Sequence, residues 1–168
     1  SFTVGIPTCY GGESIINTVK TLRASKGVSN FRIVIIADRT PIKKQIKDKL
    51  EKMDVELYWN EKEGSQFKKL KQLIGKCKED ILIFTQDDIT FDKYTLKNII
   101  RAFSENPRAT MVSTTVFPLS PITFFEAIKT SETRIHNNIT KQWNNADNYF
   151  ASSGRCISFR SKHIEKFR

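Results

Sequence analysis

The chain has 168 residues, and its 28 lysines and arginines outnumber its 18 aspartates and glutamates to give a net charge of +10. This length fits one domain with its own core, and a hydrophobic content of 39% excludes a disordered chain. No apolar run approaches the roughly 18 residues that span a bilayer. The three cysteines are far apart and lack CxxC spacing, which argues against a disulfide framework or a zinc site and suits a reducing, cytoplasmic compartment.

Short apolar runs alternate with amphipathic stretches over the first 116 residues. The runs predict strands at residues 2–6, 32–37, 55–59, 80–85 and 110–116. The stretches between them space their apolar side chains as helices do. This alternation predicts an α/β fold with a mostly parallel central sheet and helices on both faces, a Rossmann-like three-layer arrangement. Pro7 is expected to end the first strand.

The pattern changes after residue 116. Residues 124–139 are expected to form a polar, irregular helix, and residues 157–159 a late strand. Phe124 and Phe125 at the start of that helix could equally belong to the core. We find no internal repeat or linker, so residues 1–168 are interpreted as a single domain.

The positive charge is spread along the chain, but one segment reverses sign. Residues 81–100 carry three acidic and two basic side chains. A spread excess is typical of solvated surface, and it leaves open attraction to the phosphates of a nucleotide, a nucleic acid or an anionic lipid. Peripheral association with a membrane surface therefore also stays open.

The acidic segment contains two adjacent carboxylates, Asp87 and Asp88, which directly follow the fourth predicted strand. Ligands of open α/β sheets bind at the carboxyl ends of the strands. Neighbouring carboxylates there raise each other's pKa, and a divalent cation that bridges them to phosphate oxygens removes this cost. A solvated turn is the alternative interpretation.

Other polar groups are expected at the same edge of the sheet. Asp38 ends the second predicted strand, where a carboxylate can accept from a base or a ribose or simply form a turn. Gly11 and Gly12 let the backbone approach a ligand closely, and Tyr10 could stack on a base. This loop is no GxGxxG fingerprint, and the chain contains no GxxxxGK[ST] sequence.

Lys68 and Lys69 lie at the start of the third predicted helix, where a diphosphate would also meet the helix dipole. Lysines on a helix are more commonly solvated. Each cysteine is interpreted as a small buried hydrophobe rather than a nucleophile.

Taken in order, these motifs resemble those of family 2 glycosyltransferases. The resemblance covers nearly the whole chain and lies in residues 6–13, 33–40, 64–73, 81–88 and 151–160. It implies a GT-A fold, a nucleotide-sugar donor and a Mn²⁺ or Mg²⁺ cofactor. It also implies that residues 1–116 form the nucleotide-sugar-binding half and residues 117–168 the start of an acceptor-binding half.

The resemblance also implies roles for particular residues. Those expected around the base, ribose, diphosphate or sugar are Pro7, Thr8, Tyr10, Glu13, Asp38, Lys68, Lys69 and Asp87. Asp88 is expected to hold the metal on the diphosphate. The candidates on the acceptor side are Phe124, Phe125, Trp143, Ser153 and Gly154.

Two departures from the family pattern stand out. Gln86 replaces the first carboxylate of the DxD motif, so metal dependence is expected to differ. Inverting members place a catalytic Asp beyond the glycine-containing segment, whereas Asp147 precedes Gly154. The catalytic base is therefore left unassigned and is expected beyond Arg168.

The function predicted from these residues is transfer of a sugar from a UDP- or GDP-sugar to an acceptor hydroxyl on a glycan, a lipid or a small molecule. Three alternatives stay open: a nucleotidyltransferase of related fold, a donor-binding fragment without turnover, and a basic nucleic-acid-binding domain. Lysines interleaved with acids, as in residues 47–52, argue against the last, so no nucleic-acid partner is expected.

Overall fold

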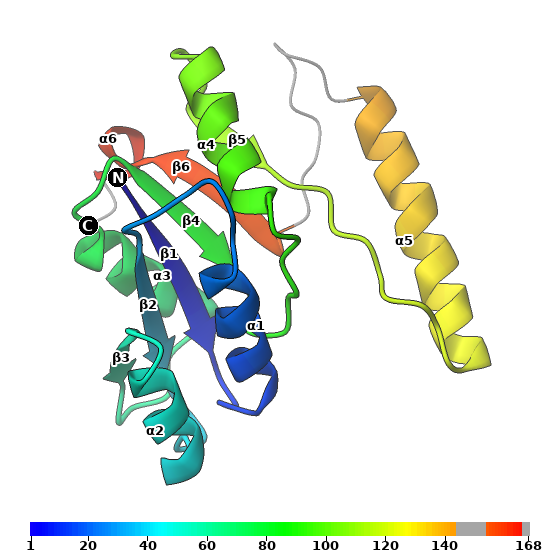
Figure 1. Ribbon diagram of the computed structural model, residues 1–168. Coiled ribbons are helices and arrows are strands. Elements are labelled where there is room, and N and C mark those ends of the chain that lie inside the picture. The colour runs from blue at the N-terminus through cyan, green and yellow to red at the C-terminus, as the bar shows by residue number, and fades with distance from the viewer. Residues whose placement is uncertain (144–153, 166–168) are drawn as a thin grey trace.

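The computed structural model describes residues 1–143 and 154–165 (Figure 1). The described residues form a six-stranded sheet in the order β3-β2-β1-β4-β6-β5. Its strands are β1 (Phe2–Thr8), β2 (Arg32–Ala37), β3 (Glu56–Trp59), β4 (Ile81–Thr85), β5 (Met111–Ser113) and β6 (Cys156–Arg160). Strands β1 to β4 pair in parallel, and β6 pairs antiparallel with both β4 and β5.

Helices cover both faces of this sheet. The described helices are α1 (Ser14–Arg23), α2 (Lys44–Glu51), α3 (Gln66–Lys76), α4 (Thr95–Glu105), α5 (Phe124–Trp143) and α6 (Ser161–Ile164), and all but α5 contribute to these two layers. Successive side chains of β4 point to opposite faces. Ile81 and Ile83 pack with α1, α2 and α4, whereas Leu82 and Phe84 pack with α3 and α6. The predicted three-layer α/β fold is confirmed.

The first strand is longer than its sequence predicts, because Pro7 does not end it. Pairing of β1 with β4 stops at Gly5 opposite Phe84, whereas pairing with β2 continues through Pro7 to Thr8. Pro7 therefore lies beyond the hydrogen-bonded pairing of β1 with β4. Its lack of a backbone N–H destabilises the sheet less there.

The late strand changes the order of the sheet. The predicted strand at 110–116 is reduced to β5, and β6 lies between it and β4. The Thr114 N–H still donates to the Cys156 carbonyl, at 3.3 Å, but the chain then leaves the sheet. This arrangement places the residues before β6 beside the carboxyl end of β4.

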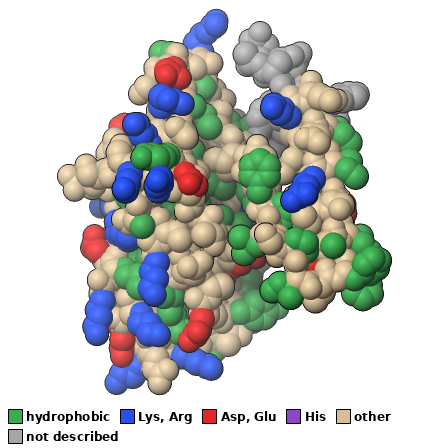
Figure 2. All heavy atoms as spheres, turned by 45° about the vertical axis from the view of Figure 1, so that its right-hand side comes forward, with side chains coloured by type: hydrophobic (Ala, Val, Ile, Leu, Met, Phe, Trp, Pro, Cys, Tyr) green, Lys and Arg blue, Asp and Glu red, His purple; other side chains and the backbone are tan. Residues whose placement is uncertain are grey.

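Helix α5 stands at the side of the molecule, beyond β5 and α4 (Figure 1). Phe124 and Phe125 are 75% and 78% exposed, so they are not core residues. Ile128, Ile135 and Ile139 are also exposed, and Figure 2 shows hydrophobic side chains on the surface of this part of the molecule. None of the described helices is both long and apolar enough to span a membrane.

Candidate functional site

The carboxyl ends of the parallel strands bring the predicted site loops together, and Thr8 at the end of β1 connects two of them. The Thr8 hydroxyl donates to the carboxylate of Asp87 and accepts from the Gly11 N–H at 3.2 Å. Thr18 of α1 donates to the Asp87 carbonyl at 3.0 Å. The first loop and the turn after β4 are therefore fixed to each other.

Gly11 allows this first loop to turn closely over the sheet edge. Its φ is +50°, which L side chains rarely adopt, and a Cβ there would lie 2.5 Å from Cγ1 of Ile42. A side chain at this position would displace the loop that carries Thr8 and Tyr10.

Asp38 directly follows β2 and forms a buried ion pair with Lys69 of α3. The Lys69 Nζ lies 2.6 Å from Asp38 Oδ1, and the two side chains are 1% and 0% exposed. Burial alone would raise the pKa of Asp38, but hydrogen bonds from Lys69 and the Gly64 N–H hold it below its ordinary value. Burial acts to lower the pKa of Lys69, and Asp38 and Cys9 outweigh it, so the pKa is raised. Both partners are therefore charged at neutral pH.

The two neighbouring lysines consequently differ in what they can reach. Lys68 is exposed at the first turn of α3, where its N–H donates to the Ser65 hydroxyl at 3.3 Å and caps the helix. Lys69 points into the protein instead, where its ammonium also lies 3.0 Å from the Cys9 sulfur. Only Lys68 of this pair has a side chain in solvent.

An exposed aromatic and cationic group lies next to this ion pair. Tyr10 is 68% exposed, and the Arg39 guanidinium lies 5.9 Å from the centre of its ring. Arg39 also forms an ion pair with Glu63. The Tyr10 ring therefore presents a surface on which a planar group can stack.

The turn after β4 carries Asp87, which is half-buried, and Asp88, which is exposed. Among the described residues, Asp88 makes no ion pair, and no group of three or more His, Cys, Asp or Glu side chains could enclose a metal ion. One exposed carboxylate does fit a cation held mainly by substrate phosphates and water, as is usual for Mg²⁺. A cation that depends on the diphosphate is therefore compatible with this turn.

The glycine-containing segment lies beside the same turn. The Arg155 carbonyl accepts from the Gln86 N–H at 3.2 Å and from the Thr85 hydroxyl at 3.1 Å. Gly154, which precedes Arg155, is exposed. The structure therefore brings Gly154 to the carboxyl end of β4.

Of the remaining predicted residues, Pro7 and Glu13 make no side-chain hydrogen bond or ion pair with Asp38 or Asp87, and the side chains of two others lie outside the described residues. Pro7 is half-buried in β1, and Glu13 is exposed just before α1 without a side-chain cap. Ser153 and the side chain of Trp143 lie outside the described residues.

Sequence reasoning missed several residues of this site. It interpreted Cys9 as a buried hydrophobe, whereas the structure places it half-buried against Lys69. It also overlooked Thr18 and Arg39. Arg39 follows Asp38 directly and Cys9 lies between Thr8 and Tyr10, so proximity to the predicted loops was an available signal.

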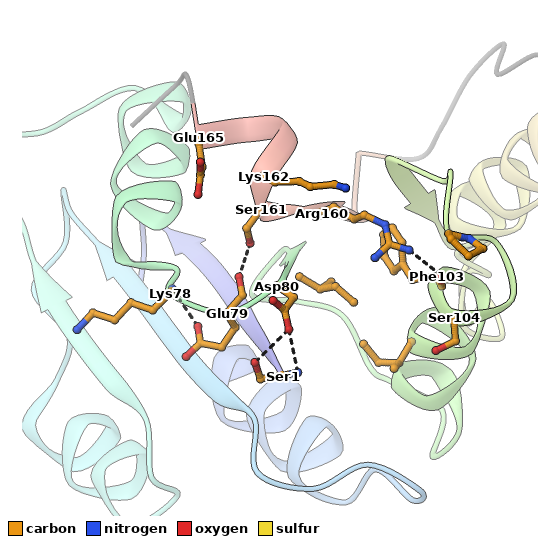
Figure 3. A pocket seen from close by; sticks show the side chains of 13 residues that line it. Ser1, Lys78, Glu79, Asp80, Phe103, Ser104, Arg160, Ser161, Lys162 and Glu165 are labelled. Atoms are coloured by element: carbon orange, nitrogen blue, oxygen red, sulfur yellow. Dashed lines mark hydrogen bonds and ion pairs between the residues drawn. The ribbon is translucent and has the colours of Figure 1, made fainter.

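A cavity of about 670 Å³ lies at the opposite, amino edge of the sheet (Figure 3). Its polar groups pair with one another: Asp80 accepts from the Ser1 amine at 3.5 Å, and Ser161 donates to the Glu79 carbonyl. Arg160 donates to the Phe103 carbonyl at 2.7 Å. Exposed carboxylates, Asp80 and Glu165, line this cavity as well, but Asp80 is paired with the Ser1 amine.

Residues 3–167 match the family model described as Glycosyl transferase family 2. No curated protein matches the chain by sequence.

Solved structures resemble the chain at low sequence identity. S. aureus TarS 1-349 in complex with UDP has a TM-score of 0.71 at 16% identity, over 99% of this chain and 48% of that one. The mannosyltransferase PcManGT from Pyrobaculum calidifontis, in complex with GDP-Man and Mn²⁺, has a TM-score of 0.68 at 15% identity, over 98% and 46%. CMP:2-keto-3-deoxy-manno-octonic acid synthetase complexed with CTP has a TM-score of 0.56 at 14% identity, over 99% and 77%.

The fold is confirmed as that of the GT-A glycosyltransferases. The chain spans about half the length of the TarS and PcManGT chains that it matches.

Proposed function

Because this chain belongs to glycosyl transferase family 2, we propose that it forms the donor-binding part of an enzyme that transfers a sugar, with inversion, from a UDP- or GDP-sugar to an acceptor hydroxyl. The observation that carries this proposal is the set of polar groups at one sheet edge, where Asp38 follows β2 and Asp87 and Asp88 follow β4, the two strands that flank β1. Structural relatives bind UDP in one case and GDP-Man with Mn²⁺ in another.

The nucleotide is proposed to lie across the ends of β1 and β2. Asp38 is buried, so it would accept from the base or the ribose once the Gly64 N–H that bonds its Oδ2 moves aside. The exposed ring of Tyr10 would stack on the base. Pro7 and Thr8 at the end of β1 and Glu13 just before α1 are proposed to lie around the base. Thr8 acts there by holding the loop to Asp87, which faces the ribose or the sugar.

The two lysines are proposed to act in different ways. The exposed Lys68 would approach the diphosphate at the start of α3, where the helix dipole also favours an anion. Lys69 would act indirectly, because its ammonium fixes the orientation of Asp38.

A divalent cation, Mn²⁺ or Mg²⁺, would be held on the diphosphate by Asp88. When bound, it neutralises the charge that develops on the departing nucleoside diphosphate. Gln86 offers only an amide oxygen next to it, which is a weaker ligand than a carboxylate. Trp143, Ser153 and Gly154 are proposed for the acceptor side, and Gly154 is the member of this set that lies beside the Asp87–Asp88 turn through Arg155. We assign the deprotonation of the acceptor hydroxyl to none of the described residues.

The decisive experiment is a calorimetric titration of the protein with UDP and with GDP, each with and without Mn²⁺. We expect binding of at least one nucleotide that Mn²⁺ strengthens about tenfold or more. Asp88→Asn should remove the Mn²⁺ effect. Asp80→Asn is a matched control, because Asp80 is exposed at the other end of β4. Absence of binding by both nucleotides would refute the donor site, and an unchanged Mn²⁺ effect in Asp88→Asn would refute the role of Asp88.

A nucleotidyltransferase is the second candidate, favoured by the likeness to a synthetase complexed with CTP. Such an enzyme releases pyrophosphate from a nucleoside triphosphate, whereas a glycosyltransferase releases a nucleoside diphosphate from its donor. A coupled pyrophosphate assay with the four nucleoside triphosphates separates the two reactions.

A further inference from the structure

Cys9 and Lys69 form a contact that the proposed donor-binding role does not use. The Cys9 sulfur lies 3.0 Å from the Lys69 Nζ, and Lys69 is itself buried against Asp38. Cys9 is half-buried, whereas Cys77 and Cys156 are buried. Among the cysteines, Cys9 therefore combines partial access to solvent with a cation at its sulfur.

Partial access to solvent favours oxidation of Cys9 over the other two thiols, which are buried. Peroxide that reaches Cys9 oxidises a sulfur that a nitrogen already contacts. Burial raises the pKa of the Cys156 thiol, so it stays protonated. Cys77 is buried, and its sulfur lies 3.4 Å from the Ser161 hydroxyl.

We propose that Cys9 and Lys69 are a peroxide-responsive pair, in which oxidation of Cys9 leads to a covalent sulfur–nitrogen bond with Lys69. The geometry points to this product because the Lys69 nitrogen already lies against the sulfur that peroxide would oxidise. A sulfenic acid condenses with a nucleophile within reach, and the Lys69 side chain has no solvent-facing alternative.

The steps balance in atoms and charge. The Cys9 thiolate attacks hydrogen peroxide, the O–O bond breaks, and a sulfenic acid and hydroxide form. The hydroxide takes a proton from the Lys69 ammonium and becomes water. The neutral amine then attacks sulfur, the S–O bond breaks, and a second water leaves. Sulfur is oxidised by two electrons, peroxide is reduced, and the protein is two hydrogen atoms lighter.

The bond would change the nucleotide site, a consequence that rests on the proposed function. It removes the ammonium charge that balances Asp38, which is buried and holds a pKa below its ordinary value. Asp38 would then take up a proton or shift towards solvent. We expect UDP or GDP to bind roughly tenfold or more weakly after oxidation, and a thiol reductant to restore binding.

The test is peroxide treatment of the whole chain followed by peptide mass mapping without reduction. We expect a linked pair of peptides that contains Cys9 and Lys69, is two hydrogen atoms lighter than the sum of its parts, and separates on addition of dithiothreitol. Cys9→Ser should abolish it, and Cys77→Ser and Cys156→Ser should keep it. In Lys69→Arg, which keeps the cation, Cys9 should instead be trapped by dimedone as a sulfenic acid.

Three results would overturn the proposal. They are faster oxidation of Cys77 or Cys156 than of Cys9, conversion of Cys9 to a sulfinic acid without the link, and formation of the link without any change in nucleotide binding. Because mass mapping needs no nucleotide, a protein that binds neither UDP nor GDP would refute the donor site and leave the covalent pair measurable.

Discussion

The two edges of the sheet both hold ionic groups, but only one edge balances them within the chain. At the amino edge, Arg32 donates to both oxygens of Glu56, at 2.7 and 2.8 Å, and to Glu79 at 3.1 Å. Thr3 donates to Glu79 as well. Each of these carboxylates has a cationic partner in the chain, which is the pattern of a structural cluster.

The carboxyl edge balances Asp38 and Glu63 with cations but leaves the carboxylates after β4 without them. Asp38 has Lys69 as its buried partner, whereas Asp88 has no ion-pair partner among the described residues. Asp87 receives a hydroxyl hydrogen bond from Thr8 instead of a cation. The difference teaches that excess carboxylate, rather than ionic content or cavity size, distinguishes the edge suited to a cation and a phosphate ligand.

The largest expected effect comes from breaking the buried pair at the carboxyl edge. Asp38→Asn leaves the Lys69 ammonium buried without its carboxylate, which should lower the free energy of unfolding by about 3–5 kcal/mol. Urea unfolding followed by circular dichroism measures it. The double variant Asp38→Asn/Lys69→Met should recover much of the loss. Asp54→Asn is the matched control, since Asp54 is exposed and paired with Arg23. An Asp38→Asn protein as stable as the parent would contradict the structural reading of this pair.

The next effect tests whether the amino edge is only structural. Arg32→Met removes the shared partner of Glu56 and Glu79, and we expect the free energy of unfolding to fall by about 2 kcal/mol. Nucleotide affinity should stay unchanged, because Arg32 begins β2 and the proposed site lies at its other end. Loss of UDP or GDP binding in a folded Arg32→Met protein would break the distinction between the edges.

A smaller effect is expected from the hydroxyl that joins the site loops. Thr8→Val conserves shape but leaves the Gly11 N–H without its acceptor and Asp87 without its donor. We expect a loss of about 1–2 kcal/mol in the free energy of unfolding, together with weaker nucleotide binding. Thr21→Val in α1 is the control, because its hydroxyl bonds the Thr18 carbonyl and the Phe91 N–H rather than Gly11 or the Asp87 carboxylate. Equal nucleotide affinity in Thr8→Val and the parent would show that the loop needs no such anchor.

The pH dependence gives the smallest and most specific test. The pKa of Asp38 is lower in the folded protein than its ordinary value, because Lys69 and Gly64 outweigh the effect of burial. A group of this kind contributes stability above the ordinary aspartate range and loses it as the pH falls through its folded pKa. Below about pH 4, stability should therefore fall less steeply in Asp38→Asn than in the parent. Parallel pH profiles of unfolding free energy would contradict the shift.

Much of the fold could be predicted because local patterns dictate it. The apolar runs at 32–37 and 80–85 correspond to β2 and β4, both central strands covered on two faces. The insertion of β6 between β4 and β5 could not be predicted, because pairing between residues 81–85 and 156–160 depends on contacts far apart in sequence.

The candidate site shows the same division. That Asp38, Asp87 and Asp88 would meet at one edge followed from their positions after predicted strands. The sequence alone could not predict which of two adjacent lysines faces solvent and which faces the protein interior. Lys68 and Lys69 differ by one step around a helix, which is enough to turn one ammonium outwards and to bury the other.

By itself, the sequence determined the alternation of strands and helices, the parallel core of the sheet and the edge at which its carboxylates gather, since hydrophobic periodicity and strand direction are local properties. The tertiary structure alone decided which charges are balanced. Asp38 forms an ion pair with Lys69, Lys69 also contacts Cys9, and Asp88 is exposed. These pairings depend on how elements distant in sequence pack together. Because burying an unpaired charge is unfavourable, the pairing affects the stability of the folded protein.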